Sequence, residues 1–189
     1  RELITVPNEK DDKPDSLDRV RDDRAPTRRS GFMARRVREL AEKARELNLT
    51  DDVAVVFADK NLEAAVREAL GRPEGQLTRE DLKRLSKLDA REREIEDING
   101  LRYVVDLTEL LLDDNEISDV SPLASLTNLT ELDLRGNEIS DISPLASLTN
   151  LTELRLDSNG ISDITPLSSL TNLTDLHLND NEISDVSLL

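Results

Sequence analysis

The sequence of 189 residues contains no cysteine and no tryptophan, and its aromatic residues are two Phe and one Tyr. Without cysteine, the chain can form no disulfide, and it can have no metal site or nucleophile that depends on a thiolate. No run of about 18 apolar residues is present, so we expect no membrane-spanning helix. A globular core usually contains more large aromatic side chains, whereas a core of stacked Leu and Ile needs none. These absences favour a repeat protein.

Negative charge is concentrated in the second half of the chain. Residues 107–189 hold 16 acidic residues against two basic ones, Arg135 and Arg155, and so account for most of the formal net charge of −16. Residues 1–52, in contrast, carry as many basic as acidic residues. An acidic surface repels the phosphate backbone, so nucleic-acid binding by this half is not expected. We expect its partner to be another protein with a neutral or basic surface.

One repeated segment organises the second half. It reads LTELDLRGNEISDISPLASLTN at 129–150, recurs at 107–128 and 151–172, and begins again at 173–189. Its L-x-x-L-x-L-x-x-N pattern is that of a leucine-rich repeat. A single repeat cannot bury enough apolar surface to offset its ordering entropy, so the repeats are expected to stack as coils.

The spacing also predicts what each repeat position does. Two Leu per repeat point inward from a short strand, and the Ser-Pro-Leu-Ala-Ser segment forms a 3₁₀ turn. A shift by one repeat towards the N-terminus keeps every core position apolar, which makes 85–106 a degenerate first repeat, with Arg93 at the Asn position. The Asn residues are predicted to form a structural ladder that bonds backbone groups of adjacent coils. They are Asn115, Asn137, Asn159 and Asn181.

The residues before the repeats divide into three segments. Residues 1–31 are rich in charge and Pro and are predicted to be an extended or disordered arm, or else a segment that docks through 3–6. Residues 32–52 are predicted to form an amphipathic helix and a linker.

Residues 53–84 are predicted to form a helical cap that covers the apolar end of the repeats. A short strand or an extended segment that enters the cap is expected at 53–57. A helix should begin after Asp59 or Asn61 and end at Gly71. A capping box at Thr78 should open a second helix, with Leu82 and Leu85 on one face.

The quoted repeat, with Ile-Ser-Asp-Ile-Ser-Pro-Leu and Leu-Thr-Asn-Leu, resembles bacterial internalin-like leucine-rich repeat proteins. Residues 57–70, FADKNLEAAVREAL, resemble the helical cap that precedes such repeats. The resemblance covers 53–189, and residues 1–52 match no family. It implies an α/β solenoid with a parallel β-sheet on the concave face, 3₁₀ turns on the convex face and an α-helical N-terminal cap. It also implies protein recognition on the concave face and a secreted or cell-surface location, while a cytoplasmic location stays open.

The candidate partner-binding surface consists of the outward strand positions on the concave face, which vary while the core does not. Its residues are Glu109, Leu111, Asp113, Glu131, Asp133, Arg135, Glu153, Arg155, Asp157, Asp175, His177 and Asn179. Stacked Glu residues at the first position of each strand are unfavourable for folding, which favours a binding role. The absence of aromatic residues, which are common in binding hot spots, favours a solvated scaffold instead.

No catalytic, metal or cofactor site is predicted. His177 is the single histidine, and although Asp157 and Asp175 should lie near it, a solvated surface role is favoured. Asp119, Asp141, Asp163 and Asp185 recur once per repeat. Calcium needs six to eight converging oxygen ligands, so these residues are predicted to cap the following turns instead.

The function predicted from the sequence is a non-enzymatic protein–protein interaction module. Two alternatives remain, an intracellular adaptor or regulatory subunit and the scaffold fragment of a larger enzyme, each docking through 1–52. The last repeat stops within its turn, so weak self-association through an uncapped C-terminal end at 176–178 is also expected.

Overall fold

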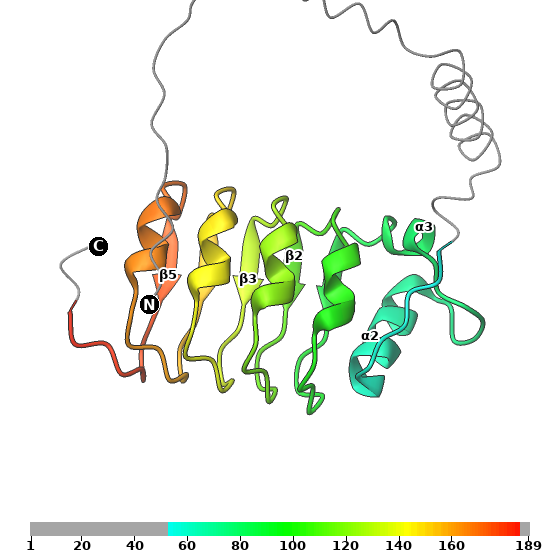
Figure 1. Cartoon of the computed structure of the whole chain (residues 1–189), viewed down its shortest axis with the longest axis horizontal. Helices are drawn as coiled ribbons and strands as arrows, with labels where there is room; N and C mark the ends of the chain where they lie inside the picture. Colours follow the sequence, from blue (N-terminus) through cyan, green and yellow to red (C-terminus); the bar gives the residue numbers. More distant parts are fainter. Residues whose placement is uncertain (1–52, 186–189) are drawn as a thin grey trace, which may run out of the picture. The chain divides into compact units, whose positions relative to one another are not determined.

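The computed structural model describes residues 53–185 (Figure 1). The predicted arm at 1–31 and the predicted amphipathic helix and linker at 32–52 lie outside the described residues, as do residues 186–189. Self-association through the C-terminal end stays a prediction.

Five short parallel strands form one sheet in the order of the chain (Figure 1). They are β1 (Lys87–Asp89), β2 (Glu109–Leu111), β3 (Glu131–Asp133), β4 (Glu153–Arg155) and β5 (Asp175–His177). Each residue pairs with its counterpart in the next repeat, so that Leu88, Leu110, Leu132, Leu154 and Leu176 form one row across the sheet. The sequence period therefore equals one coil of the structure, and the predicted solenoid is confirmed.

A 3₁₀ helix lies on the opposite side of each of the first four coils (Figure 1). These turns are η1 (Asn99–Tyr103), η2 (Ser121–Ser125), η3 (Ser143–Ser147) and η4 (Thr165–Ser169). Pro stands in the first turn of η2, η3 and η4, where its missing N–H costs no hydrogen bond. The chain then returns to the next strand within a few residues, which keeps the coils in contact.

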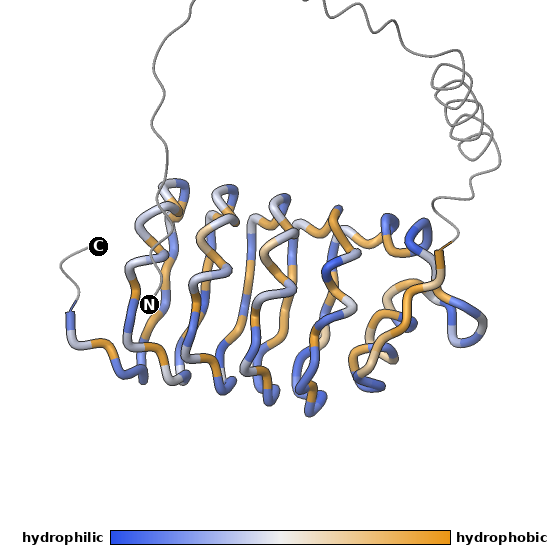
Figure 2. The backbone as a smooth tube through the Cα atoms, in the orientation of Figure 1, coloured by the Kyte–Doolittle hydropathy of each residue, from blue (hydrophilic) through white to orange (hydrophobic). Residues whose placement is uncertain are grey.

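The core is a column of aliphatic side chains between the sheet and the 3₁₀ turns. In the coil of β2, for example, Leu110, Leu112, Ile117 and Leu123 are fully buried. Figure 2 shows apolar residues at the same places in successive coils. Because each coil repeats the same shapes, aliphatic residues fill the space without aromatic side chains.

The Asn at the end of each strand segment bonds its own coil to the preceding one. Asn137 Nδ2 donates to the carbonyl oxygens of Leu112 and Leu134 at 3.0 Å each and of Arg135 at 3.1 Å. Its Oδ1 accepts from the Ile117 N–H of the preceding coil at 3.0 Å. This buried amide thus bonds four backbone groups in two coils, and among the described residues it is the one partner of the Ile117 N–H.

The same bonds recur at Asn115, Asn159 and Asn181. In the first coil Arg93 occupies the Asn position, and Asn115 Oδ1 accepts from the Arg93 N–H at 3.1 Å. The ladder therefore runs from Asn115 to Asn181 and holds together all five coils.

Two helices lie before the first coil. Helix α2 (Lys60–Leu70) begins after Asp59, ends at Gly71 in the left-handed conformation and buries Leu62 and Val66 over β1. Helix α3 (Arg79–Leu82) begins with the expected capping box between Thr78 and Asp81.

One prediction about these residues is wrong in extent. Helix α3 has only four residues, so Leu85 lies beyond it, although Leu85 is buried. Of the two forms expected at 53–57, the structure shows the extended segment, with a single antiparallel bridge between Ala54 and Thr78.

Phe57 and Asp59 are among the residues that join the helices to the first coil. The Phe57 ring lies against Gly100, where an added Cβ would come within 2.2 Å of the ring. Gly100 occupies the position that holds Pro in the next three coils, so this exception makes room for Phe57. Asp59 uses Oδ1 to accept from the Asn61 and Leu62 N–H groups and Oδ2 to accept from those of Glu96 and Asp97. One carboxylate thus caps a helix and holds it on the first coil.

Replacing Asp59 by Asn should lower the free energy of unfolding by about 1–3 kcal/mol at pH 7, because the amide nitrogen cannot accept the two bonds from the first coil. Burial opposes ionisation of Asp59, yet its four backbone donors outweigh burial and hold its pKa below the ordinary 3.8. This stabilisation is present above pH 3.8 and is lost as the pH falls through the lower, folded-state pKa.

Urea unfolding of both proteins at pH 7 and at pH 2–3 measures the effect, and the difference between them should shrink at acid pH. Asp141→Asn is the matched control, because Asp141 accepts one backbone bond, from Ser143, which an Asn oxygen can retain. Equal losses in the two variants would contradict the role of Asp59.

Candidate functional site

The outward side chains of β1–β5, together with the residue two positions after each strand, form one surface, the strand face. All twelve residues of the predicted binding surface lie on it, in the coils of β2 to β5. Seven of the twelve are acidic, and Arg135 and Arg155 are the only basic ones. With Lys87, Asp89 and Arg91 of the first coil, the strand face has eight acidic residues against four Lys and Arg. It is therefore acidic from β2 to β5, and it contains no Phe, Tyr or Trp.

The first positions of β2, β3 and β4 form a column of like charges, with Lys87 before them in β1. Glu109 pairs in register with Glu131, and Glu131 with Glu153. Glu109 contacts Lys87 Nζ, and Glu153 contacts Arg155 Nη2. Within residues 53–185 no ion pair forms with Glu131, and burial together with Glu153 and Glu109 raises its pKa above the ordinary value. Glu131, at the centre of this column, thus has no cation bonded to it.

Asp133 holds both arginines of the predicted surface. It is only 2% exposed and accepts from Arg135 Nε at 2.9 Å, from Arg135 Nη2 at 2.7 Å and from Arg155 Nη1 at 3.4 Å. Burial opposes its ionisation, but the arginines and a backbone N–H outweigh burial and lower its pKa. Asp133 orients Arg135 and Arg155 and is itself covered.

Asp113 is also buried, but it lacks a comparable partner. It is 7% exposed, and its Oδ1 accepts no hydrogen bond within the described part of the chain. The closest cationic group, Arg135 Nη2, lies 3.7 Å from Oδ2, beyond a normal hydrogen bond. Burial and the neighbouring Asp133 raise the pKa of Asp113. Buried carboxylates are nearly always hydrogen-bonded, so this one is exceptional.

Leu111 is the one apolar side chain among the twelve residues. It is half-buried and lies in register between Asp89 of β1 and Asp133 of β3. On its own coil the neighbouring outward residues are Glu109 and Asp113. The strand face thus contains a small apolar surface with carboxylates around it.

The structure brings His177 together with the two aspartates expected near it. Its Nε2 lies 3.0 Å from Asp175 Oδ1, and its Nδ1 lies 3.8 Å from Asp157 Oδ2. Asp157 also accepts from Asn179 Nδ2 at 2.6 Å. In residues 53–185 no three His, Cys, Asp or Glu side chains are grouped as metal ligands.

The aspartates that recur once per coil lie on the side of the 3₁₀ turns. Asp119 and Asp141 each accept from the N–H of the Ser two residues later at 2.8 Å, and Asp163 accepts from Thr165 at 2.9 Å. These carboxylates cap the turns and lie on different coils.

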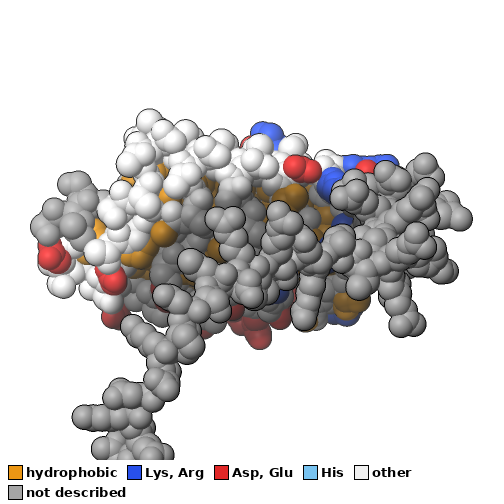
Figure 3. Space-filling view, turned by 45° about the horizontal axis from the view of Figure 1, so that its top comes forward, with side chains coloured by type: hydrophobic (Ala, Val, Ile, Leu, Met, Phe, Trp, Pro, Cys, Tyr) orange, Lys and Arg blue, Asp and Glu red, His pale blue; other side chains and the backbone are white. Residues whose placement is uncertain are grey.

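The surface of the 3₁₀ turns differs from the strand face in chemistry. Residues 120–130, 142–152 and 164–174 contain no charged residue. In Figure 3 the visible part of this surface is mostly white, with acidic groups at its edges. In the Asn-Leu-Thr sequences of the repeats, the side chains of Asn128, Asn150 and Asn172 donate to carbonyl oxygens of the preceding coil. The polar groups here serve coil stacking.

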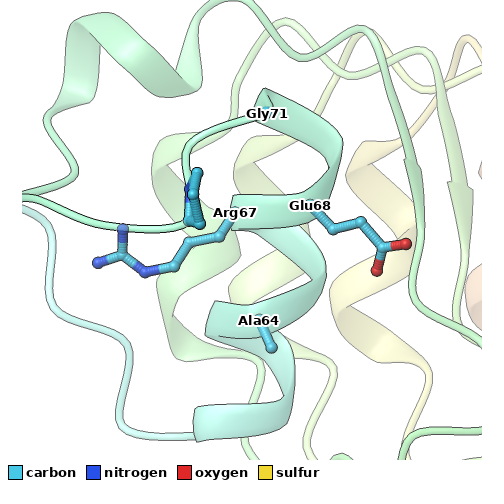
Figure 4. A pocket seen from close by; sticks show the side chains of 5 residues that line it. Ala64, Arg67, Glu68 and Gly71 are labelled. Carbon is cyan, nitrogen blue, oxygen red and sulfur yellow. The ribbon is translucent and has the colours of Figure 1, made fainter.

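A shallow hollow lies beside helix α2 (Figure 4). It is lined by Ala64, Arg67, Glu68, Gly71 and Pro73. Arg67 bonds Glu63 at 2.8 Å, and Glu68 bonds Arg93 at 2.7 Å. Both charged side chains of the hollow are thus engaged in structural ion pairs, and the strand face remains the candidate site.

Replacing Glu131 by Gln should raise the free energy of unfolding by about 0.5 kcal/mol at pH 7, since it removes the central charge of a like-charge column. A carboxylate with a raised folded-state pKa is least favourable when ionised, so the gain should vanish as the pH falls below the ordinary 4.5.

Thermal or urea unfolding at pH 7 and pH 3 measures this gain. Glu182→Gln is the control, because the preceding coil has Gly160 at the equivalent position and no like charge. A loss of stability at pH 7 for Glu131→Gln would contradict the interpretation of the column.

Comparisons with known proteins support the repeat architecture. The family model described as Leucine Rich repeats (2 copies) matches residues 105–147 and again 149–189. A comparison with curated proteins gave no significant match. No helix within the described residues is long and apolar enough to cross a membrane.

Three solved structures of internalins from Listeria monocytogenes are similar to this chain. Internalin F is 31% identical with a TM-score of 0.62, over 70% of this chain and 46% of that one. Internalin C2 is 31% identical with a TM-score of 0.51, over 71% and 90%. The functional domain of InlJ, which includes a cysteine ladder, is 30% identical with a TM-score of 0.65, over 70% and 29%. The chain thus spans less than half of the first and third structures. It belongs to the internalin-like family of bacterial leucine-rich repeat proteins.

Proposed function

We propose that this chain is a non-enzymatic recognition module that binds a basic protein surface through its strand face. The repeats form a protein-interaction scaffold, as in other leucine-rich repeat proteins. The observation that carries the proposal is that Glu131 has no ion pair within the described residues and that Asp113, just beyond β2, has only a 3.7 Å contact with Arg135. Burial and neighbouring carboxylates raise the pKa of both groups. Like charges placed side by side cost folding stability, so their presence favours a role in binding.

Charge and rigidity both favour the strand face over the surface of the 3₁₀ turns. Seven acidic residues against two arginines attract a basic partner and accelerate its association. The outward side chains lie on strands that the Asn ladder fixes, so little conformational entropy would be lost on binding. The turn surface, in contrast, has no charge in 120–130, 142–152 or 164–174 to select a partner.

The enzymatic and adaptor alternatives depend on residues 1–52, which lie outside the described residues. Within 53–185, the polar groups that come close together form ion pairs or caps, and no arrangement of nucleophile and base accompanies them. The recognition module is therefore the function that these residues support best.

A photo-crosslinking residue at Glu153, on the strand face, should capture a protein partner, whereas the same residue at Ser168, in η4, should not. The identified partner should then bind the Glu109→Lys, Glu131→Lys double variant at least about ten-fold more weakly, a loss of about 1.4 kcal/mol, because two favourable charges are reversed. Isothermal calorimetry at two salt concentrations measures this.

Glu116→Lys, Glu138→Lys is the matched control, with the same change of net charge in the turns after the Asn ladder. Its affinity should stay within about two-fold of the original. Equal weakening by both double variants, or adducts formed only from Ser168, would contradict binding through the strand face.

A further inference from the structure

We propose that the strand face contains a socket for one basic side chain, Lys or Arg, of the partner. Leu111 forms its apolar floor, and Asp113 and Glu131 supply its charge. The inference rests on the proposed function and names the chemical group that this surface receives.

Among the strand-face carboxylates in the coils of β1 to β3, two form no hydrogen bond with a cation. Arg91 bonds Asp89 at 2.7 Å. Arg135 bonds Asp133, and Arg155 contacts both Asp133 and Glu153. Lys87 contacts Glu109. Every basic residue on this surface is therefore paired, whereas Asp113 has only a 3.7 Å contact and Glu131 has no ion pair within the described residues.

These two carboxylates lie on either side of Leu111. Asp113 is the next outward residue on the same coil. Glu131 is on the adjacent strand, where it pairs in register with Glu109, so it lies diagonally across from Leu111. Both carboxylates are thus neighbours of Leu111, about 6–8 Å from it between Cα atoms, so a cation held over Leu111 would lie between their two negative charges.

Asp113 gives independent evidence for a missing donor. Its Oδ1 is buried without a hydrogen-bond partner, which is unfavourable for a polar group. Only 10% of its side-chain surface is exposed, so a donor reaches the carboxylate when the side chains around it move apart. Such a donor would add the hydrogen bond that Arg135, at 3.7 Å, does not make.

The apolar floor distinguishes a basic side chain from a metal ion. Lys and Arg have an aliphatic stem that packs on apolar surface while the charged end reaches a carboxylate. Calcium needs six to eight oxygen ligands, and it gains nothing from contact with Leu111. Within residues 53–185 no group of metal-ligating side chains is present, which agrees with this choice.

The test is an NMR titration of the isotope-labelled full chain with N-acetyl-lysine methylamide. We expect saturable shifts centred on the Leu111 methyl groups and the Asp113 amide, with a Kd on the order of 1–10 mM. N-acetyl-norleucine methylamide, which has the stem without the charge, and ammonium chloride, which has the charge without the stem, should give no saturable shift there.

Three variants separate the parts of the socket. Asp113→Asn with Glu131→Gln, and Leu111→Ser alone, should each weaken lysine binding at least about five-fold, whereas Glu116→Gln with Glu138→Gln should leave it unchanged. If Asp113→Asn fails to fold, Glu131→Gln alone, which removes no hydrogen bond, still tests the charge.

Equal shifts at all acidic residues, equal weakening by the control pair, or saturable binding of calcium chloride at Asp113 would each overturn the socket. Its failure is distinguishable from that of the proposed function. If Glu109→Lys with Glu131→Lys abolishes binding of the partner while Leu111→Ser does not change it, the strand face binds without a socket.

Discussion

The structure depends on the hydrogen bonds that one Asn side chain makes in two coils. Each ladder amide satisfies carbonyl oxygens of its own coil and of the preceding one, and it accepts an N–H from the preceding coil. The chain must turn at this point while it stays buried, so backbone groups there can find no water. A side chain with both donors and an acceptor is needed, which Asn provides and an aliphatic residue does not.

The ladder also determines the chemistry of the outer surface. Because it fixes the register at one repeat per coil, any residue repeated at an outward position is stacked directly on its copy. Glu109, Glu131 and Glu153 are stacked for this reason. Folding energy comes from the inward aliphatic residues, so the outward positions can tolerate unfavourable charge. Asp113 and Glu131, which form no hydrogen bond with a cation, lie on the strand face, the surface that we propose binds the partner.

Much of the architecture could be predicted from periodicity, because each repeat position has the same surroundings in every coil. The strands, the 3₁₀ turns and the helix after Asp59 follow from local patterns. The residue before each ladder Asn has a left-handed backbone conformation, but the sequence indicates this only at Gly136. Asp114, Ser158 and Asp180 adopt the same conformation without being glycine.

Contacts between different coils could not be predicted in the same way. Asp133 was expected on an accessible surface, but arginines from its own coil and from the next one cover it. Its neighbour Asp113 becomes buried without gaining such a partner. Asp59 could be identified as a helix cap, but its second pair of bonds goes to residues nearly forty positions away. At 53–57 the local pattern could not decide between a strand and an extended segment, because a strand requires a neighbour, which no local pattern specifies.

Amide hydrogen exchange of the Asn137→Ala variant, together with its urea unfolding, tests the ladder most directly. The account predicts a loss of about 1–3 kcal/mol and faster exchange at the Ile117 N–H, because this buried N–H loses its partner and three carbonyl oxygens each lose one of two bonds. Asn181→Ala removes the same set of bonds at a half-buried site, so its loss should be clearly smaller. Equal losses below about 0.5 kcal/mol in both variants would contradict the claim that the ladder holds the coils together.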